Sequence, residues 1–427
     1  MVFRSAHAWL LSVSALLLAG SGRARSEPPA AGLEPAATTT AAASTTATLP
    51  APSLVPDPNP PEPVTLGRPH LDLGLGRWVA PVIRDGAADG EAILTIDPNL
   101  QAKLERSLEN WTVPWGAIVM LDPRDGRVLA LAEHSHAQPA RQDLALSALS
   151  PAASIFKLVT ATALLEAGVE PDQTVCYHGG KRRLQPKLLA DDARRDRRCT
   201  TLVSAFGHST NTVFAKLAGR GLDGPALRAT AARFLFNGAI PFARPVETST
   251  VEVGDDPFEV ANTAAGFGKV RLSPLHGALL AEIVANRGVL VPPRLVAELR
   301  GAVLPPEPEP RRVVAPEVAG RLAEMMRATV TEGTARRAFR RVAPALRGVQ
   351  VAGKTGSLFE RAPFRDHTLF VGYAPADRPE VAIAVVVVNE RTWRVRAPSL
   401  AREALEIYFG TRVADAGPAA LQRVAAR

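Results

Sequence analysis

Apolar and polar positions recur along this chain with two different periods, and these predict the order of strands and helices. The stretch "AILTIDPNLQAKLERSLENW" indicates a strand followed by a helix. The next segments, "GAIVMLD" and "RVLALAE", have the period of strands, and "PRDG" between them places Asp125 and Gly126 where a tight turn is expected. This part of the chain therefore predicts a strand, a helix and a β-hairpin.

The middle of the chain, from Ser154 to about Ala285, has a mostly helical pattern. Its first part is apolar on nearly every face, which is typical of a buried helix. Strands resume with "GVQVAGKT", "TLFVGYAP" and "VAIAVVVV", and "SLAREALEIYF" predicts a final amphipathic helix. Strands at both ends with helices between them predict an α+β fold: an antiparallel sheet of about five strands, packed with helices, plus an inserted all-helical subdomain.

The N-terminus has the layout of a secretory signal. Arg4 precedes an uncharged stretch that includes "WLLSVSALLLAG", and "RARSEPPAAG" follows it. The stretch approaches the ~17 residues that a membrane span needs. We therefore expect residues 1–25 to be a signal peptide or an uncleaved signal anchor, in a protein that is exported to the periplasm or cell envelope.

The next region is rich in Pro, Ala and Thr and cannot build a core. We expect a disordered tether over residues 26–88, a folded domain over residues 89–412 and a tail over residues 413–427.

The net charge of +8 raises the question of a nucleic-acid partner. The Arg and Lys residues are scattered without aromatic interleaving, so we expect no nucleic-acid partner.

Only seven of the 50 basic residues are Lys. Since Arg stays protonated, a buried Lys is a candidate for a titratable amine. Lys157, inside the apolar helix, either extends its head to solvent or is kept dry to act as a base.

The two cysteines, Cys176 and Cys199, fit an exported protein that could close one disulfide. Both flank a polar excursion that lacks apolar residues to hold it down. We therefore expect them to pair, which would contribute roughly 3 kcal/mol in the chain-entropy model.

Short motifs fall at informative places in this pattern. Ser154 and Lys157 form S-x-x-K at the start of the buried helix, where positions i and i+3 share a face. Ser209 and Asn211 form S-x-N at an expected entry from loop to helix.

A third motif, K-T-G, consists of Lys354, Thr355 and Gly356 and is extended by Ser357 at the end of a predicted strand. Each motif alone is weak, but the three in this order are a strong signal.

In these motifs the sequence resembles the penicillin-binding transpeptidases, serine D,D-peptidases that share a fold with the serine β-lactamases. The likeness runs from about Ile93 to Phe409 and includes "GAIVMLDPRDGRVLAL", "GFGKVRLSPLHGAL" and "ANRGVLVPPRLV". Ala152-Ala153 stands where the family usually has Pro-Gly. Neither a glycosyltransferase domain nor a large pedestal has room before residue 90, so we expect a tethered transpeptidase domain alone.

The resemblance implies a role for each motif residue. Ser154 would attack the carbonyl of a D-alanyl-D-alanine bond, with Lys157 as the general base. Ser209 would relay a proton to the leaving amine, and Asn211 would bind the substrate amide and hold Lys157.

The resemblance also implies how the substrate is bound. Lys354 would recognise the terminal carboxylate and disfavour protonation of Lys157, while Thr355 and Ser357 bind the same carboxylate. Gly356 would let an extended peptide lie against the strand. The backbone N–H groups of Ser154 and Ser357 would form the oxyanion hole. No cofactor or metal is implied.

Other polar residues receive no role. His208 is expected to be structural. Glu332, Gly333 and Thr334 resemble a family segment near the rim of the active site, but a helix that ends at Gly333 explains them equally well, so we do not assign them to the site.

The predicted function is a peptidoglycan D,D-transpeptidase that acts on stem peptides, is inhibited by β-lactams and is served by a glycosyltransferase of wall synthesis. The alternatives are a D,D-carboxypeptidase or β-lactamase of the same fold and a non-catalytic penicillin-binding scaffold. A β-lactamase would need a Glu to activate water, and the sequence offers no recognisable candidate.

Overall fold

The computed structural model describes residues 65–180, 183–301 and 308–415. The chain divides into the units Met1–Pro60 and Pro61–Arg427. The first unit lies outside the described residues, and so do the expected signal segment and the chain after residue 415. Among the described residues, no helix is long and apolar enough to cross a membrane.

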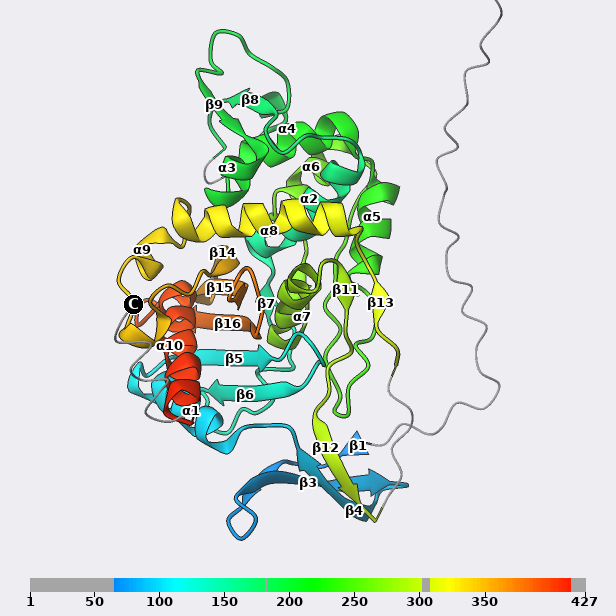
Figure 1. Cartoon of the computed structure of the whole chain (residues 1–427). Coiled ribbons are helices and arrows are strands. Elements are labelled where there is room, and N and C mark those ends of the chain that lie inside the picture. Colours follow the sequence, from blue (N-terminus) through cyan, green and yellow to red (C-terminus); the bar gives the residue numbers. More distant parts are fainter. Residues whose placement is uncertain (1–64, 181–182, 302–307, 416–427) are drawn as a thin grey trace, which may run out of the picture. The chain divides into compact units, whose positions relative to one another are not determined.

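A five-stranded antiparallel sheet forms the centre of the second unit, with the order β14-β15-β16-β5-β6 (Figure 1). Its strands are β14 (Ala352–Arg361), β15 (Phe364–Ala374), β16 (Val381–Asn389), β5 (Trp115–Leu121) and β6 (Val128–His134). Strands from the C-terminal third thus lie beside the hairpin near the start of the fold, because β16 pairs with β5. This arrangement confirms the predicted α+β class.

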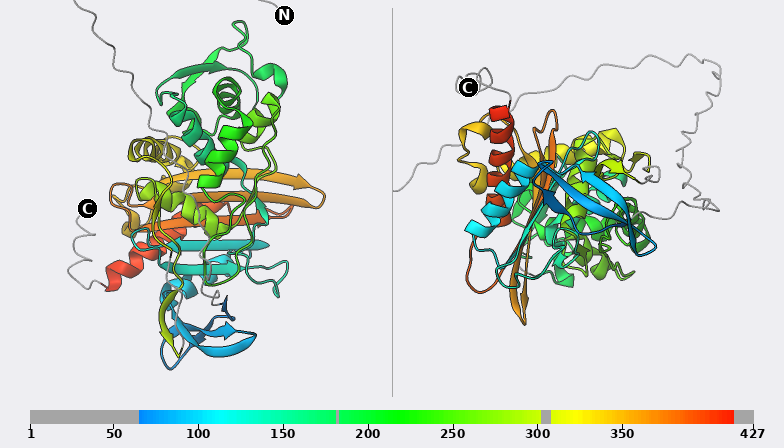
Figure 2. Two further views of the ribbon diagram at one scale, coloured as in Figure 1. Left: turned by 90° about the vertical axis from the view of Figure 1, so that its right-hand side faces the viewer. Right: turned by 90° about the horizontal axis from the view of Figure 1, so that it is seen from below.

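Helices cover both faces of this sheet (Figure 2). Every residue of β16 is buried, and its alternate side chains enter two separate apolar clusters. Helix α7 (Pro274–Ala285) packs on one face, while α1 (Pro98–Asn110) and α10 (Ala397–Asp415) pack on the other. The uninterrupted apolar run of β16 is the sequence signature of a strand that is buried on both faces.

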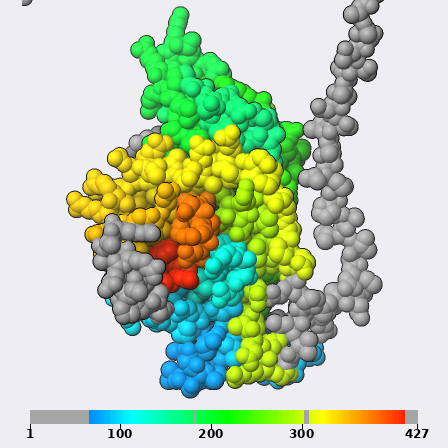
Figure 3. All heavy atoms as spheres, viewed as in Figure 1, coloured from blue at the N-terminus to red at the C-terminus, as the bar shows by residue number. Residues whose placement is uncertain are grey.

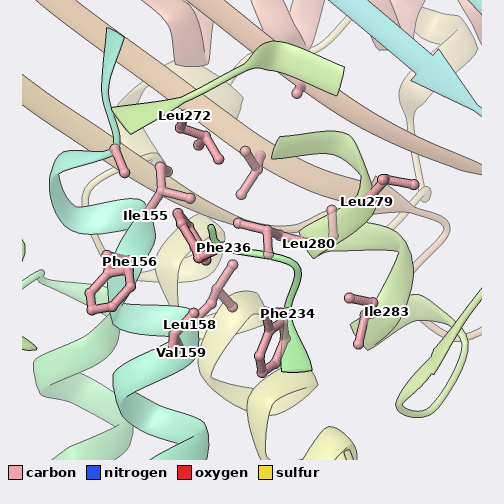
Figure 4. Close-up of a cluster of buried hydrophobic side chains, with 14 of the residues drawn as sticks. Ile155, Phe156, Leu158, Val159, Phe234, Phe236, Leu272, Leu279, Leu280 and Ile283 are labelled. Carbon is pink, nitrogen blue, oxygen red and sulfur yellow. The ribbon is translucent and has the colours of Figure 1, made fainter. Parts of the chain in front are cut away.

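The helical region lies on the α7 side of the sheet and carries the first motif. Its elements are η1 (Ala153–Phe156), α2 (Lys157–Glu166), α3 (Leu202–Gly207), α4 (Asn211–Gly221), α5 (Gly224–Arg233), α6 (Pro257–Ala264) and α8 (Pro316–Thr331). Phe156 packs edge to face on Phe236 with ring centroids 5.3 Å apart, and Leu158 and Leu280 lie in the same cluster (Figure 4). This dense packing fixes α2, and with it the turn that precedes it.

Short elements complete the fold. They are β7 (Ser150–Pro151) with β10 (Arg271–Leu272), β8 (Thr174–Tyr177) with β9 (Arg198–Thr201), β11 (Val289–Leu290) with β13 (Arg311–Arg312), and η2 (Pro186–Leu188), α9 (Arg336–Phe339) and η3 (Pro344–Leu346).

The expectation of a disordered tether up to residue 88 is wrong over its last part, which forms a second sheet. This sheet consists of β1 (Thr65–Leu66), β2 (His70–Asp72), β3 (Arg77–Arg84), β4 (Ala87–Leu94) and β12 (Val296–Arg300). Asp85 and Gly86 both have positive φ, as a tight hairpin turn requires, and Val79 and Val82 are buried. Pro81 interrupts the strand pattern of "RWVAPVIRDG", and the β3–β4 register shifts there. Residues 65–88 therefore belong to the folded part of the chain, and the expected start of the folded domain at residue 89 is too late.

A disulfide joins Cys176 to Cys199 across the β8–β9 pair. The expectation that the excursion between them lacks apolar anchors is wrong, because Leu184 and Leu188 are buried. Lys216 of α4 is also buried and donates a hydrogen bond to the Cys176 carbonyl oxygen at 3.3 Å. The excursion is thus fixed to the helix that carries Asn211.

Candidate active site

Ser154 lies in the η1 turn that leads into α2. The residue before it, Ala153, has φ +48°, a left-handed conformation that favours glycine. The turn is held from both sides. The Ala152 N–H donates to the Val270 carbonyl oxygen at 2.9 Å, and a Cβ at Gly266 would lie only 2.4 Å from the Ala153 carbonyl oxygen. Glycine is thus needed at position 266, and the backbone at Ala153 is locally strained.

Lys157 is fully buried, so it does not extend its head to solvent. Its Nζ lies 2.9 Å from Ser154 Oγ, 2.8 Å from Asn211 Oδ1 and 2.5 Å from the Ala265 carbonyl oxygen. A neutral amine has two N–H donors and one lone pair. Two of these neighbours are pure acceptors, which leaves the lone pair directed to the Ser154 hydroxyl.

The electrostatics of the site favour the neutral form of this lysine. Burial lowers the pKa of Lys157 well below its ordinary value, and the charge of Lys354 lowers it further. The arrangement can therefore remove a proton from Ser154.

Lys354 is also fully buried and lies opposite Ser209. Its Nζ lies 3.2 Å from Ser209 Oγ and 2.9 Å from the Thr355 carbonyl oxygen, to which it donates a hydrogen bond. The same Nζ is 5.4 Å from the ring centre of Phe206, so a cation here is stabilised by the aromatic face. Burial lowers the pKa of Lys354 to about 7.

The K-T-G motif lies near the beginning of β14, not at the end of a strand as expected, and the strand continues to Arg361. Strand β14 is at the edge of the sheet, and among the described residues only β15 pairs with it. Its outer side could therefore pair with an extended ligand. Thr355 is buried, whereas Ser357 is exposed. A Cβ at Gly356 would lie 3.1 Å from both the Ala152 carbonyl oxygen and Ile155 Cγ1. Gly356 therefore lets the strand approach the Ser154 turn, a role that the sequence did not suggest.

The structure brings the motif residues together in two linked groups. Ser154, Lys157 and Asn211 form the first, and Ser209, Lys354 and Thr355 form the second. Helix α8 packs on α2, α3 and β14, and in Figure 3 it lies between the rest of the helical region and the sheet.

Two residues that contact the motifs were not assigned to the site from the sequence. The Ala265 carbonyl oxygen, at the end of α6, contacts Lys157, and Thr334 Oγ1 lies 2.6 Å from Thr355 Oγ1. A sequence does not indicate which backbone atoms contact a side chain. The segment "GFGKV", which directly follows Ala265, was part of the family resemblance.

His208 does not join the site. It is exposed at the end of α3, where its Nδ1 lies 3.0 Å from the Ser204 carbonyl oxygen. The part of the chain that the structure describes holds no cluster of His, Cys, Asp or Glu that could bind a metal.

A serine next to a dehydrated lysine, a second serine facing a second lysine, and an open strand edge define a serine acyl-transfer site. The chain belongs to the family of penicillin-binding protein transpeptidase domains, whose model matches residues 116–406.

Individual relatives are peptidoglycan D,D-transpeptidases. The chain is 32% identical to PbpA of Mycobacterium tuberculosis over 315 residues, which cover 64% of this chain and 62% of that protein. It is 26% identical to MrdA of Haemophilus influenzae over 389 residues, which cover 77% of this chain and 58% of that protein. The matched region thus spans about three fifths of the length of these relatives.

Solved structures agree with this assignment. The crystal structure of PBPA from Mycobacterium tuberculosis matches with a TM-score of 0.59 and 27% identity, covering 74% of this chain and 81% of that one. An imipenem acyl-enzyme complex of the same protein matches with a TM-score of 0.60 and 27% identity, covering 76% and 80%.

Proposed function

We propose that this protein is a peptidoglycan D,D-transpeptidase that works through an acyl-enzyme on Ser154. The observation that carries the proposal is the environment of Lys157, whose buried Nζ faces the Ser154 hydroxyl and two carbonyl acceptors. Relatives that bear the name D,D-transpeptidase support the same reaction.

In the first step, Ser154 Oγ attacks the carbonyl carbon of a D-alanyl-D-alanine bond, and its proton passes to Lys157 Nζ. The backbone N–H groups of Ser154 and Ser357 stabilise the oxyanion. The C–N bond then breaks and leaves an ester on Ser154, while the proton held by Lys157 is relayed through Ser209 to the amine of the departing D-alanine, so that Lys157 is neutral again and Ser209 keeps its hydroxyl. In the second step, an amine from another stem peptide attacks the ester carbonyl and gives a proton to Lys157. The ester C–O bond then breaks, and this proton returns to Ser154 Oγ and restores the serine hydroxyl.

Recognition depends on the terminal carboxylate of the substrate. The Lys354 ammonium supplies an opposite charge, and the hydroxyls of Thr355 and Ser357 donate hydrogen bonds. Asn211 binds the amide that precedes the scissile bond while it holds Lys157. β-Lactams carry a carboxylate beside a ring amide, so they would enter the same site.

The reaction is tested by mixing the protein with a stem pentapeptide that ends in D-alanyl-D-alanine and an acceptor stem peptide with a free amine. We expect both free D-alanine and a cross-linked dimer, detected by mass spectrometry. D-Alanine without the dimer would instead indicate a carboxypeptidase. Protein treated first with benzylpenicillin is the control and should yield neither product.

A β-lactamase is less well supported by the site. Among the described residues, neither Ser154 nor Lys157 has a carboxylate among its hydrogen-bond partners. The described residues therefore offer no carboxylate next to the ester to activate a water molecule.

Lys354 predicts a distinctive pH dependence. Since its pKa is lowered to about 7, the cation that binds the carboxylate is present below this pH and is lost as the pH rises through it. The second-order rate of acylation by benzylpenicillin should therefore fall on the alkaline side. Lys354→Arg keeps its charge and should remove this alkaline limb, while its larger planar head lowers the maximum rate. Lys354→Ala should be slow throughout, and equal rates for this variant and the wild type would exclude the role.

We propose that the protein acts in the cell envelope, outside the cytoplasmic membrane. The expected signal in residues 1–25 and the Cys176–Cys199 disulfide support this location. A fusion of residues 1–66 to a reporter that is active only after export should be active, and an inactive fusion would contradict the proposal.

A glycosyltransferase of wall synthesis would supply the nascent glycan, and cross-linking of the exported protein in cells should capture this enzyme.

A further inference from the structure

Thr334 lies just beyond the end of α8 and contacts two of the motif-bearing segments. Its backbone N–H donates to the Gly207 carbonyl oxygen at 3.0 Å, close to Ser209 in the chain. Its Oγ1 lies 2.6 Å from Thr355 Oγ1 on the edge strand. Thr334 therefore bridges the segment that carries Ser209 and the strand that carries Lys354.

The backbone around Thr334 fixes the position of this hydroxyl. A Cβ at Gly333 would lie 2.1 Å from the Gly207 carbonyl oxygen, so only glycine lets the end of α8 approach α3 this closely. The Ala335 N–H donates to the Thr329 carbonyl oxygen at 3.0 Å and closes the turn after the helix. The segment is thus more than a plain helix end, and its contact with Thr355 is part of the architecture of the site.

Each threonine hydroxyl has one proton to donate. The Thr334 proton has two acceptors: Thr355 Oγ1 at 2.6 Å, and the Gly207 carbonyl oxygen at 3.3 Å, which already accepts the Thr334 N–H. When Thr334 donates to Thr355, the Thr355 proton is free to point away from Thr334. An anion beside Thr355 favours this direction, because both hydroxyl dipoles then point toward the negative charge.

We propose that Thr334 is a positioning residue that directs the Thr355 hydroxyl proton to the carboxylate of the bound ligand. This inference rests on the proposed function, because it assumes that Thr355 binds that carboxylate. Thr334 itself does not touch the reacting atoms and acts only through the Thr355 hydroxyl.

The test replaces the Thr334 hydroxyl with a methyl group of similar size. Thr334→Val should lower the second-order rate of acylation by benzylpenicillin by about 5- to 10-fold, the value of one hydrogen bond to a group that binds an anion. Thr334→Ser keeps the hydroxyl and should restore most of the rate. With benzylpenicillin methyl ester, which lacks the carboxylate charge, Thr334→Val and the wild type should react at the same rate. In a Thr355→Val background, Thr334→Val should have no further effect.

Two results would overturn the inference: an unchanged rate for Thr334→Val with benzylpenicillin, or an equal loss with the acid and the ester. The second would show that Thr334 acts through packing alone. The failure of the proposed function has a separate signature, since a folded wild type would then form no penicillin adduct, and the role of Thr334 would fall with it.

Discussion

Ser154→Ala should abolish covalent labelling by benzylpenicillin. Ser154 Oγ is the hydroxyl next to the dehydrated Lys157 amine, and the substitution removes the only atom that could form the ester at this position. Alanine fits the η1 turn, since it removes one oxygen and adds no bulk, so the variant should fold. Intact-protein mass spectrometry should show one adduct on the wild type that persists for many minutes and none on the variant.

Ser147→Ala is a matched control for this experiment. Ser147 is a serine on the same segment, and its Oγ donates only to the Asp143 carbonyl oxygen at 2.8 Å. This variant should be labelled like the wild type. An adduct on Ser154→Ala would place the nucleophile elsewhere, and rapid return of the wild type to its unmodified mass with repeated turnover would favour a β-lactamase. A folded wild type that forms no adduct would indicate a scaffold.

The sequence predicted the elements whose signals are local. The hairpin of β5 and β6 follows from two apolar runs on either side of the turn at Asp125 and Gly126, and its pairing is as expected. The run "VAIAVVVV" predicted a strand, and β16 is a strand that is buried on both faces. Motif spacing was equally informative, because S-x-x-K on one helical turn places both side chains on one face.

The sequence could not predict contacts that depend on the tertiary fold. The Ala265 carbonyl oxygen reaches Lys157 only because α6 ends beside α2, and any residue could supply that atom. Thr334 is far from Thr355 in the chain and lies in a segment that a helix end explained equally well. The small sheet from residue 65 was missed because Pro81 breaks its alternation and Pro-rich sequence precedes it.

The two buried lysines of the site need opposite charge states, and the structure supports this division. Lys157 must be neutral to accept a proton, and the charge of Lys354 adds to burial in lowering its pKa. Lys354 must be charged to bind a carboxylate, and burial alone lowers its pKa, to about 7. Both effects act on Lys157 and only burial acts on Lys354, which favours a neutral base beside a cation.

Lys157→Met tests this division and should slow acylation by benzylpenicillin about 10²- to 10⁴-fold, the range that general-base catalysis provides. Methionine matches the unbranched stem of lysine and fills the buried space, but it cannot accept the Ser154 proton. The wild-type rate should fall as the pH drops and Lys157 gains a proton, and this acid limb should vanish in the variant. Lys157→Arg should not rescue the rate, because a guanidinium stays protonated.

The control for this experiment is Lys103→Met, which removes a lysine from α1 whose Nζ donates to Thr411 Oγ1 at 3.2 Å, outside the motif-bearing segments. It should keep both the wild-type rate and the acid limb. Circular dichroism and thermal unfolding should show that Lys157→Met is folded, since the substitution leaves the Ala265 carbonyl oxygen and Asn211 Oδ1 without the lysine donor. If a folded Lys157→Met is acylated at the wild-type rate with the acid limb intact, another group takes the Ser154 proton, and Lys157 only holds Asn211 and the end of α6 in place.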